Sequence, residues 1–406
     1  MGDQRLELDP RDHRRLGPEL DLFSFSEYSP GVPFWHPRGL ILYNELVAFV
    51  RAEWRRRGYL EVRAPVLLDA ALWRRSGHLP AFQGGMFFSE SEGRELALKP
   101  MNCPGHCVLF AERPRSWRDL PIRYAEVSPL HRNEPSGSLL GLKRVRGFSQ
   151  DDAHIFCRED QVEDEVVDVI SFLREVYPLL GFGRELEVEL SLRPEGSLGS
   201  EEVWAKAESV LRSALARARL SWKPSPGQGA FYGPKIDFHV KDALGRSWQC
   251  GTVQADFVQP ERFGLEYRGK DNLPHRPVMV HRAVLGSFER LIGILLEQWE
   301  GDFPLWLAPE QVRVLPVAKA HAAWGAEVVS ALEGAGLRAS LDASPGKLEK
   351  RIVAAARAKV PCVGVVGARE AAARSVSVRR RDAPLEVVPL EELAARLLAE
   401  VRRRMR

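Results

Sequence analysis

Cysteine is scarce in this sequence, with five residues among 406 and no regular spacing between them. An odd and scattered set does not suit a disulfide framework, so it indicates a reducing compartment. No apolar run approaches the roughly 20 residues that span a bilayer. The first residues are partly acidic and contain no hydrophobic core, so we expect neither a signal nor a transit peptide. These absences predict a cytoplasmic protein that does not enter the membrane.

The sequence also lacks the glycine-rich phosphate loops GxxxxGK[ST] and GxGxxG. Any nucleotide must therefore be bound on a sheet surface rather than at a glycine-capped helix. The net charge is only +3, but residues 303–406 carry eighteen Lys and Arg against eleven Asp and Glu. A basic C-terminal part favours a polyanionic partner such as a nucleic acid. Arginines on solvated helices would give the same count.

The length of 406 residues suits about two or three domains. The sequence EGDFPLWLAPEQ reads as a linker, and we place a domain boundary there, between residues 1–302 and 303–406. Before it, most strands follow one another, which predicts an α+β fold with an antiparallel sheet flanked by helices. After it, strands and helices alternate, which predicts a small α/β domain with a largely parallel sheet.

Polar side chains concentrate in the stretch 131–156, which reads as two strands joined by a basic, glycine-containing loop. Because side chains alternate along a strand, Gln150, Asp152 and His154 share one face. Arg132 and Glu134 share a face on the preceding strand. Such groups are costly to bury without ligands, so this stretch predicts a binding site.

Three side chains could bind zinc: Cys103, His154 and His281. Each lies beside polar residues, but they are far apart in sequence and form no compact metal motif. They are either three unrelated residues, with Cys103 a small buried hydrophobe, or a shared site. Three protein ligands would leave one zinc position open, as in sites that bind substrate.

Several cations could bind phosphate, because guanidinium groups match phosphate oxygens: Arg132, Arg144, Arg146, Arg290 and Lys235. A surface salt bridge is the alternative for any single arginine. In the C-terminal part, a further set could line one edge of the sheet or be a solvated strand end: Lys347, Lys359, Glu370 and Arg379–Arg381.

Named motifs connect these segments. FWHPRG followed by VRAPVLLD, with Pro65, resembles motif 1 of class II aminoacyl-tRNA synthetases. The stretch 131–156 resembles motif 2, and HRAVLGSFER resembles motif 3. MNCPGH, GAFYGPKIDF and WQCGTVQADF are similar to the threonyl-tRNA synthetase family in particular. The resemblance runs from about Asp12 to the C-terminus.

The resemblance implies roles for individual residues. Zinc would be held by Cys103, His154 and His281. The ATP site would consist of Arg132, Glu134, Arg144, Phe148, Gln249 and Arg290. Within it, Arg132 would bind the α-phosphate, Glu134 would read adenine and Phe148 would stack on the base. The threonine pocket would consist of Gln150, Asp152, Tyr232 and Gln254.

Lys235 would join Arg132 and Arg290 as a catalytic cation, and His78 would assist transfer to the terminal ribose of tRNA. The anticodon would be contacted by Lys347, Lys359, Glu370 and Arg379. Two positions depart from the family pattern: Lys359 stands where an arginine can occur, and Glu349 where a glycine is common.

The activity implied by the resemblance is threonine–tRNA ligase. ATP, with Mg²⁺, and L-threonine would form threonyl-adenylate, and the acyl group would pass to tRNA(Thr). Valine lacks the hydroxyl that zinc would bind, so rejection on the order of 10⁴-fold is expected. Serine lacks only a methyl group, worth roughly 10–200-fold.

Full-length bacterial relatives usually carry an N-terminal domain that hydrolyses seryl-tRNA. This sequence starts at the catalytic domain, so we expect no editing of Ser-tRNA(Thr) in cis, and a separate protein could supply it in trans. A homodimer formed through motif 1 is also expected. Two alternatives are a non-catalytic, tRNA-binding paralogue and an enzyme that activates threonine for another pathway.

Overall fold

The computed structural model describes residues 8–183, 186–381 and 383–404. The chain forms two compact units. The large unit contains Phe25–Pro33 and Val47–Ile294, and the small unit contains the chain up to Ser24, Phe34–Leu46 and the chain from Leu295 onwards. The boundary placed between residues 302 and 303 stays a prediction.

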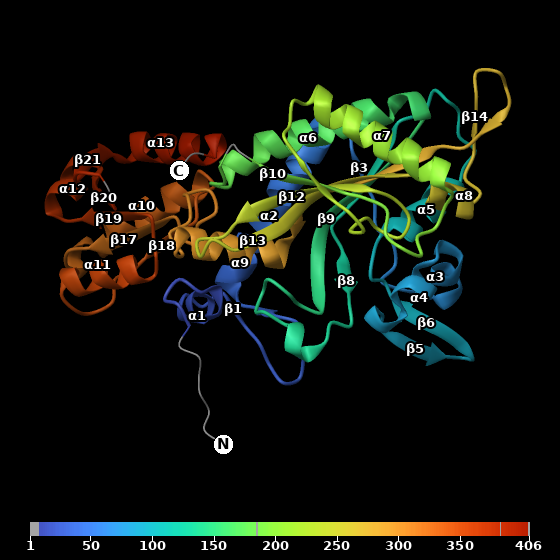
Figure 1. Cartoon of the computed structure of the whole chain (residues 1–406). Coiled ribbons are helices and arrows are strands. Elements are labelled where there is room, and N and C mark those ends of the chain that lie inside the picture. The colour runs from blue at the N-terminus through green and yellow to red at the C-terminus, as the bar shows by residue number, and fades with distance from the viewer. Residues whose placement is uncertain (1–7, 184–185, 382, 405–406) are drawn as a thin grey trace. The chain divides into compact units, whose positions relative to one another are not determined.

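The large unit is built on a nine-stranded sheet (Figure 1). Only the pairs at its two ends, β10 with β11 and β3 with β7, are parallel, and the other pairs are antiparallel. The expected antiparallel sheet is therefore confirmed. In spatial order the strands are β11 (Lys223–Ser225), β10 (Glu187–Ser191), β12 (Lys235–Lys241), β13 (Ser247–Asp256), β16 (Val278–Ser287), β9 (Gly147–Cys157), β7 (Ile122–Glu126) and β3 (Leu60–Glu61), with β8 (Pro129–His131) paired to β9.

Helices α6 (Val162–Leu179) and α7 (Glu201–Arg217) cover one face of this sheet (Figure 1). Val166, Ile170 and Leu173 form a buried stripe on α6, at the spacing of an amphipathic helix. Gly251 of β13 lies under this stripe, and a Cβ there would come within 2.6 Å of the Leu173 side chain. The sheet face beneath α6 is therefore closed by packing, and polar chemistry is left to the other face.

The N-terminal part of the chain supplies the smaller elements. Helix α2 spans Pro37–Arg56. Around Pro65 the chain forms two short strands, β3 and β4, one on either side of this residue. Proline cannot donate a ladder hydrogen bond, which explains the interruption. The other elements are α1 (His13–Glu19), β1 (Phe23–Ser24), β2 (Phe34–Trp35), β4 (Leu67–Asp69), α3 (Ala70–Ser76), α4 (His78–Phe82), β5 (Phe88–Ser91), β6 (Arg94–Leu98) and α5 (Cys103–Ala111).

Short elements complete the large unit after β13. Helix α8 and the hairpin β14–β15 precede β16, and α9 follows β16 directly. Their bounds are α8 (Val258–Arg262), β14 (Tyr267–Arg268), β15 (Pro274–His275) and α9 (Phe288–Trp299). Because α9 begins where β16 ends, residues of its first turn lie next to the end of a central strand.

The small unit contains a five-stranded sheet in the order β18-β17-β19-β20-β21. Only β18-β17-β19 is parallel, so the expectation of a largely parallel sheet is half right. The link from β19 to β20 holds one short helix, and parallel neighbours need a crossover of a dozen or more residues. The elements are β17 (Val312–Pro316), α10 (Ala322–Gly334), β18 (Ala339–Leu341), α11 (Leu348–Arg357), β19 (Cys362–Val366), α12 (Ala368–Ala373), β20 (Ser375–Arg380), β21 (Glu386–Pro389) and α13 (Leu390–Arg403).

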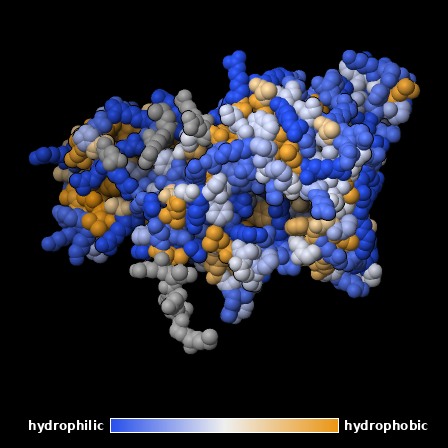
Figure 2. Space-filling model, viewed as in Figure 1, coloured by the Kyte–Doolittle hydropathy of each residue, from blue (hydrophilic) through white to orange (hydrophobic). Residues whose placement is uncertain are grey.

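The surface of the small unit is partly hydrophobic. Figure 2 shows hydrophobic residues gathered over α11, where Val353 has a relative exposure of 50%. Across residues 8–183, 186–381 and 383–404, no helix combines the length and apolar composition needed to cross a bilayer.

Candidate active site

A cavity of about 450 Å³ opens on the nine-stranded sheet. Gln150, Asp152 and His154 of β9 line it, while Asp151 and Ala153 between them do not, as strand alternation requires. Among the residues assigned to the core site from sequence, His78 does not line the cavity, and neither does Arg146, one of the candidate phosphate-binding cations. The structure brings together Cys103, Arg132, Glu134, Arg144, Phe148, Gln150, Asp152, His154, Tyr232, Lys235, Gln249, Gln254, His281 and Arg290.

Three potential metal ligands converge in this cavity. One ligand atom each from Cys103, His154 and His281 lie within 4.8 Å of one another, and all three residues are buried. His281 of β16 is directly paired with His154 of β9, and Cys103 begins α5. Burial raises the pKa of the Cys103 thiol well above its usual value, so a cation would be needed to hold the thiolate. One thiolate and two imidazoles suit zinc.

Each imidazole has a partner on its other nitrogen. His281 Nε2 lies 2.7 Å from Asp256 Oδ2, which leaves its Nδ1 for a metal. Asp256 also accepts hydrogen bonds from the main-chain N–H groups of Val258 and Gln259. His154 Nδ1 instead contacts a second histidine, so its Nε2 is the nitrogen left for a metal. Such partners orient the ligands of metal sites.

His78 lies beside the three ligands without lining the cavity. It is fully buried, and its Nε2 lies 3.7 Å from Cys103 Sγ. Burial, followed by the nearby His281 and Arg132, lowers the pKa of His78 to about 3, so the ring is neutral near pH 7. The role assigned to it in transfer to tRNA stays a prediction.

Two arginines enter the cavity from different elements. Arg132 follows β8, and its guanidinium lies 5.0 Å from the centre of the Phe148 ring. Arg290, in the first turn of α9, donates to the carbonyls of Lys143 at 3.0 Å and Gln249 at 2.9 Å. Burial lowers the pKa of both arginines. Neither forms an ion pair with a described residue, so the cavity holds two cations without carboxylate partners. This arrangement suits an anionic ligand.

The sequence predicted that Arg132 and Glu134 lie on a strand. This prediction is wrong, because β8 ends at His131. Glu134 Oε2 accepts a hydrogen bond from Arg144 Nε at 3.0 Å, which ties the two ends of the basic loop together. Arg146 donates to the Glu134 carbonyl at 2.8 Å. The loop is therefore held by its own polar groups.

Asp237 organises another wall of the cavity. Its carboxylate accepts hydrogen bonds from Lys235, from Gln249 at 2.5 Å, from Ser191 at 2.7 Å and from Thr252 at 3.1 Å. Lys235 and Asp237 are two residues apart on β12, so they share a face. Asp237 thereby fixes the orientation of two side chains that were assigned to the site.

A polar group lies on the amino-acid side of the cavity. Asn102 Nδ2 donates to Asp152 Oδ2 at 3.0 Å, and burial raises the pKa of Asp152. Tyr232 donates to Gln254 Oε1 at 3.2 Å, and its ring centre lies 5.0 Å from that of His281. These side chains could orient an amine or a hydroxyl next to the three metal ligands.

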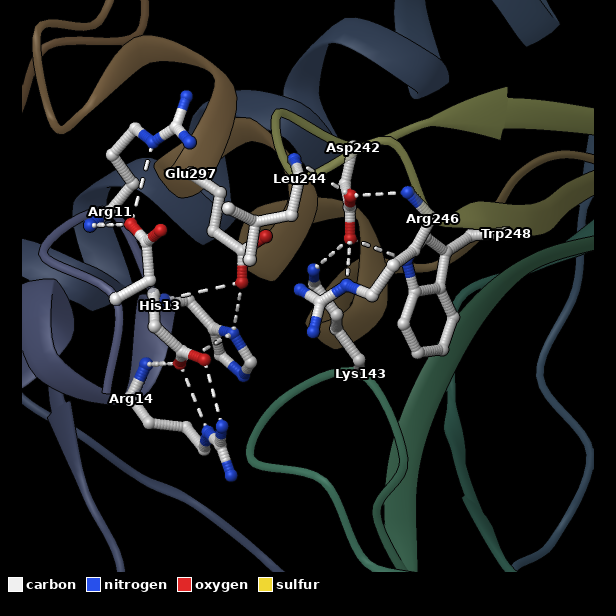
Figure 3. Close-up of polar contacts among 11 residues, drawn as sticks. Arg11, His13, Arg14, Lys143, Asp242, Leu244, Arg246, Trp248 and Glu297 are labelled. Atoms are coloured by element: carbon white, nitrogen blue, oxygen red, sulfur yellow. Dashed lines mark hydrogen bonds and ion pairs between the residues drawn. The ribbon is translucent and has the colours of Figure 1, made fainter. Parts of the chain in front are cut away.

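Asp242, in the turn between β12 and β13, anchors the basic loop (Figure 3). It accepts hydrogen bonds at 2.7 Å from Lys143 Nζ, Arg246 Nε and Trp248 Nε1. Burial would raise the pKa of Asp242, but these hydrogen bonds outweigh it and hold that pKa well below its usual range. Lys143, whose side chain is fully buried, is thus a structural cation.

A second group of potential ligands lies in the small unit (Figure 3): Asp12, His13 and Glu297. Asp12 accepts two hydrogen bonds from the Arg14 guanidinium, at 2.8 and 3.0 Å. Glu297 Oε1 accepts from the main-chain N–H of His13 and lies 2.7 Å from His13 Nδ1. These oxygens already have donors, and Arg14 brings a positive charge. The group therefore suits hydrogen bonds that hold His13 against Glu297 rather than a cation site.

The four residues assigned to anticodon contacts do not share one edge of the sheet, so that expectation is wrong. Lys347 precedes α11 and Glu370 lies in α12, both after the carboxyl ends of parallel strands. Lys359 precedes β19, and Arg379 pairs with Val363 near the start of that strand. Because β18, β17 and β19 run parallel, Lys347 and Glu370 lie toward one end of these strands, and Lys359 and Arg379 lie toward the other.

Several residues that organise the site were missed from sequence: His106, Glu126, Lys143, Asp237, Asp242, Trp248 and Asp256. Alternation along β12 could have indicated Asp237, since it shares a face with Lys235. Asp242 and Trp248 gave no such signal, because their partner Lys143 is about 100 residues away in sequence.

Comparisons with known proteins agree with this geometry. Residues 87–299 match the tRNA synthetase class II core domain (G, H, P, S and T), and residues 311–400 match an anticodon binding domain. These matches confirm the fold class predicted from the sequence. The threonine--tRNA ligases of Burkholderia mallei (strain SAVP1) and Thiobacillus denitrificans are 48% and 50% identical over 97% of this chain. The chain spans 62% of the length of these two relatives.

A solved structure resembles the chain over nearly its whole length. It is the RNA binding domain of threonyl-tRNA synthetase from Cryptosporidium parvum Iowa II, with a TM-score of 0.93 and 44% identity. The match covers 96% of this chain and 98% of that one. Together with the core domain match, this similarity means that the chain belongs to the threonyl-tRNA synthetase family of class II tRNA synthetases.

Proposed function

We propose that the chain is a threonine–tRNA ligase. The observation that carries this proposal is one cavity that combines three zinc-type ligands with two arginines that have no carboxylate partner among the described residues. The relatives that match 97% of the chain are named threonine--tRNA ligase. The substrates would be ATP with Mg²⁺, L-threonine and tRNA(Thr).

In the first step, a threonine carboxylate oxygen attacks the α-phosphorus of ATP. The bond from that phosphorus to the bridging oxygen breaks, and pyrophosphate leaves with the electron pair. Arg132 and Arg290 would stabilise the charge that develops on the phosphate oxygens, and they are already held in place by the protein. Phe148 would stack on adenine, with Glu134, Arg144 and Gln249 around the nucleotide.

In the second step, a hydroxyl of the terminal ribose of tRNA attacks the acyl carbonyl carbon, and AMP leaves. Lys235 would stabilise the adenylate, since Asp237 fixes its position in the cavity wall. For His78, direct contact with tRNA has little support because the ring is buried. A role through the adjacent Cys103 is better supported.

Zinc would be held by Cys103, His154 and His281, and when bound it supplies an open position that an amine or a hydroxyl can fill and a methyl group cannot. Gln150, Asp152, Tyr232 and Gln254 would orient threonine beside it. Asp152 is held by Asn102, so one of its oxygens has a fixed direction. Valine would leave this polar pocket unsatisfied, which predicts rejection on the order of 10⁴-fold, whereas serine loses roughly 10–200-fold.

The test is ATP–pyrophosphate exchange with threonine, serine and valine side by side, with and without a zinc chelator. We expect robust exchange with threonine, weaker exchange with serine, none above background with valine, and loss of exchange after zinc removal. Zinc-free enzyme that still prefers threonine to valine would contradict the role of the metal. Absence of threonine-dependent exchange would contradict the activity itself.

We also propose that this chain charges serine onto tRNA(Thr) and does not hydrolyse the product. Misactivation of serine is expected because the loss of one methyl group is worth only roughly 10–200-fold, so the pocket excludes serine weakly. Purified enzyme should form Ser-tRNA(Thr) at a detectable rate and leave pre-charged Ser-tRNA(Thr) intact. Rapid enzyme-dependent deacylation would refute this, and without it a separate protein would have to edit in trans.

The remaining proposals concern assembly and location. A homodimer through motif 1 is supported by β3, the end strand of the sheet, where Leu60 has a relative exposure of 57%. Replacing Leu60 with Asp should shift the mass measured by light scattering from dimer to monomer. The cytoplasm stays the proposed location, supported by five buried free thiols. Anticodon contacts would come from Lys347, Lys359, Glu370 and Arg379.

A further inference from the structure

A buried chain of four side chains leads from a lysine to one of the proposed zinc ligands. Lys99 Nζ lies 2.9 Å from Glu126 Oε1, and Glu126 Oε2 lies 3.0 Å from His106 Nε2. His106 Nδ1 in turn lies 2.8 Å from His154 Nδ1. Lys99, Glu126 and His106 are completely buried, and His154 is 2% exposed. The chain is therefore shielded from water along its whole length.

Hydrogen-bond direction along this chain is fixed from its carboxylate end. Glu126 Oε1 accepts from Lys99 Nζ and from the main-chain N–H of Ala64, at 2.9 Å each. Burial raises the pKa of Glu126, but hydrogen bonds from His106 and Lys99 outweigh it and lower this pKa to about 2. A carboxylate only accepts, so His106 must donate from Nε2. A neutral His106 then accepts at Nδ1, and His154 donates from its own Nδ1.

The consequence reaches the metal site. A neutral histidine that donates from Nδ1 carries its free electron pair on Nε2, the nitrogen left for the metal. His281 is arranged differently, because its Nε2 contacts Asp256 directly. One ligand is thus oriented by a carboxylate and the other by a carboxylate acting through a second imidazole.

We propose that His106 is a positioning residue for zinc, which holds His154 in the metal-binding tautomer and connects it to the charge of Glu126. Cys103 and His106 are three residues apart on α5, so they lie on one face of this helix. Helix α5 therefore supplies one ligand and supports a second. The inference rests on the proposed function only in taking the metal to be zinc.

Two substitutions of His106 test this role. H106L introduces an apolar side chain of similar width, which can neither donate nor accept a hydrogen bond. H106Q can donate from its amide nitrogen to Glu126 and accept from His154 Nδ1 at its amide oxygen. Zinc affinity of the 406-residue chain is measured at fixed pH by competition with a chelator, without threonine or ATP. Zinc affinity is expected to fall by roughly 10–100-fold in H106L relative to wild type. H106Q is expected to bind zinc clearly more tightly than H106L.

A third variant reverses the chain and stays informative if H106L does not fold. In E126Q the amide oxygen stays with Lys99 and Ala64, so the amide nitrogen faces His106 and donates to its Nε2. His106 would then donate from Nδ1, which forces His154 into the tautomer with a proton on Nε2. Zinc binding should weaken at least tenfold, and the visible spectrum of the Co²⁺-substituted protein should change. E126D keeps the carboxylate as a control and should stay closer to wild type.

The outcomes separate the two levels of proposal. Folded H106L or E126Q that binds zinc within twofold of wild type overturns the role of His106, while threonine-dependent exchange by the wild type leaves the proposed function standing. Equal losses in H106L and H106Q also overturn it, because the hydrogen-bond direction would then be irrelevant. Wild-type protein that contains no zinc by elemental analysis and binds none overturns both.

Discussion

Charged groups in the cavity of the large unit and two candidate anticodon residues of the small unit, Lys359 and Glu370, differ in whether they have partners. In the cavity, Arg132 and Arg290 are held by ring and main-chain contacts and have no carboxylate partner among the described residues. In the small unit, Lys359 pairs with Asp302 at 2.9 Å. Glu370 accepts from Ser377 at 2.7 Å and from a main-chain N–H.

This difference distinguishes a preorganised binding site from an exposed surface. A buried cation without a partner costs free energy unless an anion binds, so its presence indicates a ligand. A paired and partly exposed residue is stable without a ligand and could bind one only by exchanging partners. Substitutions in the cavity should therefore have large and specific effects, and those in the small unit small ones.

The largest effect is expected for Arg290. R290A should lower kcat for ATP–pyrophosphate exchange by roughly 10³-fold, because it removes a preorganised cation at the reacting phosphate. R290K should recover little of this, since an ammonium cannot reach the carbonyls of Lys143 and Gln249 with the same fork. Initial rates at saturating ATP and threonine measure it. R379A serves as the control and should leave exchange unchanged; an equal loss in both variants would remove the contrast between the two regions.

The next effect concerns stability. D242A removes an acceptor from Lys143, whose side chain is fully buried, and should lower the free energy of unfolding by about 3 kcal/mol. The basic loop would lose its anchor, so KM for ATP should rise as well. The matched control in the small unit is D302A, whose partners Lys359 and Arg381 reach solvent, and about 1 kcal/mol or less is expected there. Urea unfolding of both variants tests the difference, which would be contradicted by equal midpoints.

The fold and the ligands could be predicted from the sequence to different depths. Alternation along β9 was sufficient to group Gln150, Asp152 and His154, because the period of a strand is fixed. The motifs supplied Cys103 and His281, which spacing alone left open. Supporting residues such as His106 and Asp242 were missed, since each depends on a partner from another element. Pro65 is a local signal that a strand is interrupted. The short link through α12 is a local signal that β20 runs antiparallel to β19.

A pH effect sharpens the comparison further. Glu289, buried in the first turn of α9, accepts from the main-chain N–H of Ser149, and burial raises its pKa to about 8. The folded state thus binds a proton that the unfolded state releases near its usual pKa of 4.5. Stability from this group is complete below pH 4.5 and is lost as the pH rises toward 8, by about 1.4 kcal/mol per pH unit.

E289Q removes this slope, because a neutral amide can still accept from Ser149. The variant should match wild type near pH 5 and be the more stable protein at pH 9, as measured by urea unfolding at both values. Glu370 gives the opposite case: the hydrogen bond from Ser377 lowers its pKa, so its stabilisation is present at neutral pH and is lost as the pH falls. E370Q should therefore be no more stable than wild type at pH 9. Parallel pH curves for wild type and E289Q would contradict the prediction.

The smallest effect is expected for Lys359, which tests whether the small unit contacts RNA at all. Its side chain is 24% exposed and shares Asp302 with Arg381, so K359A should cost less than about 1 kcal/mol in stability. If Lys359 exchanges Asp302 for a tRNA phosphate, K359A should raise KM for tRNA(Thr) by a few-fold. It should also reduce the slope of log affinity against log salt by about 1. Exchange without tRNA should not change, because the cavity keeps its own cations. A fall in exchange equal to the loss in aminoacylation would mean that K359A disturbs the cavity, and the two regions would then not be independent.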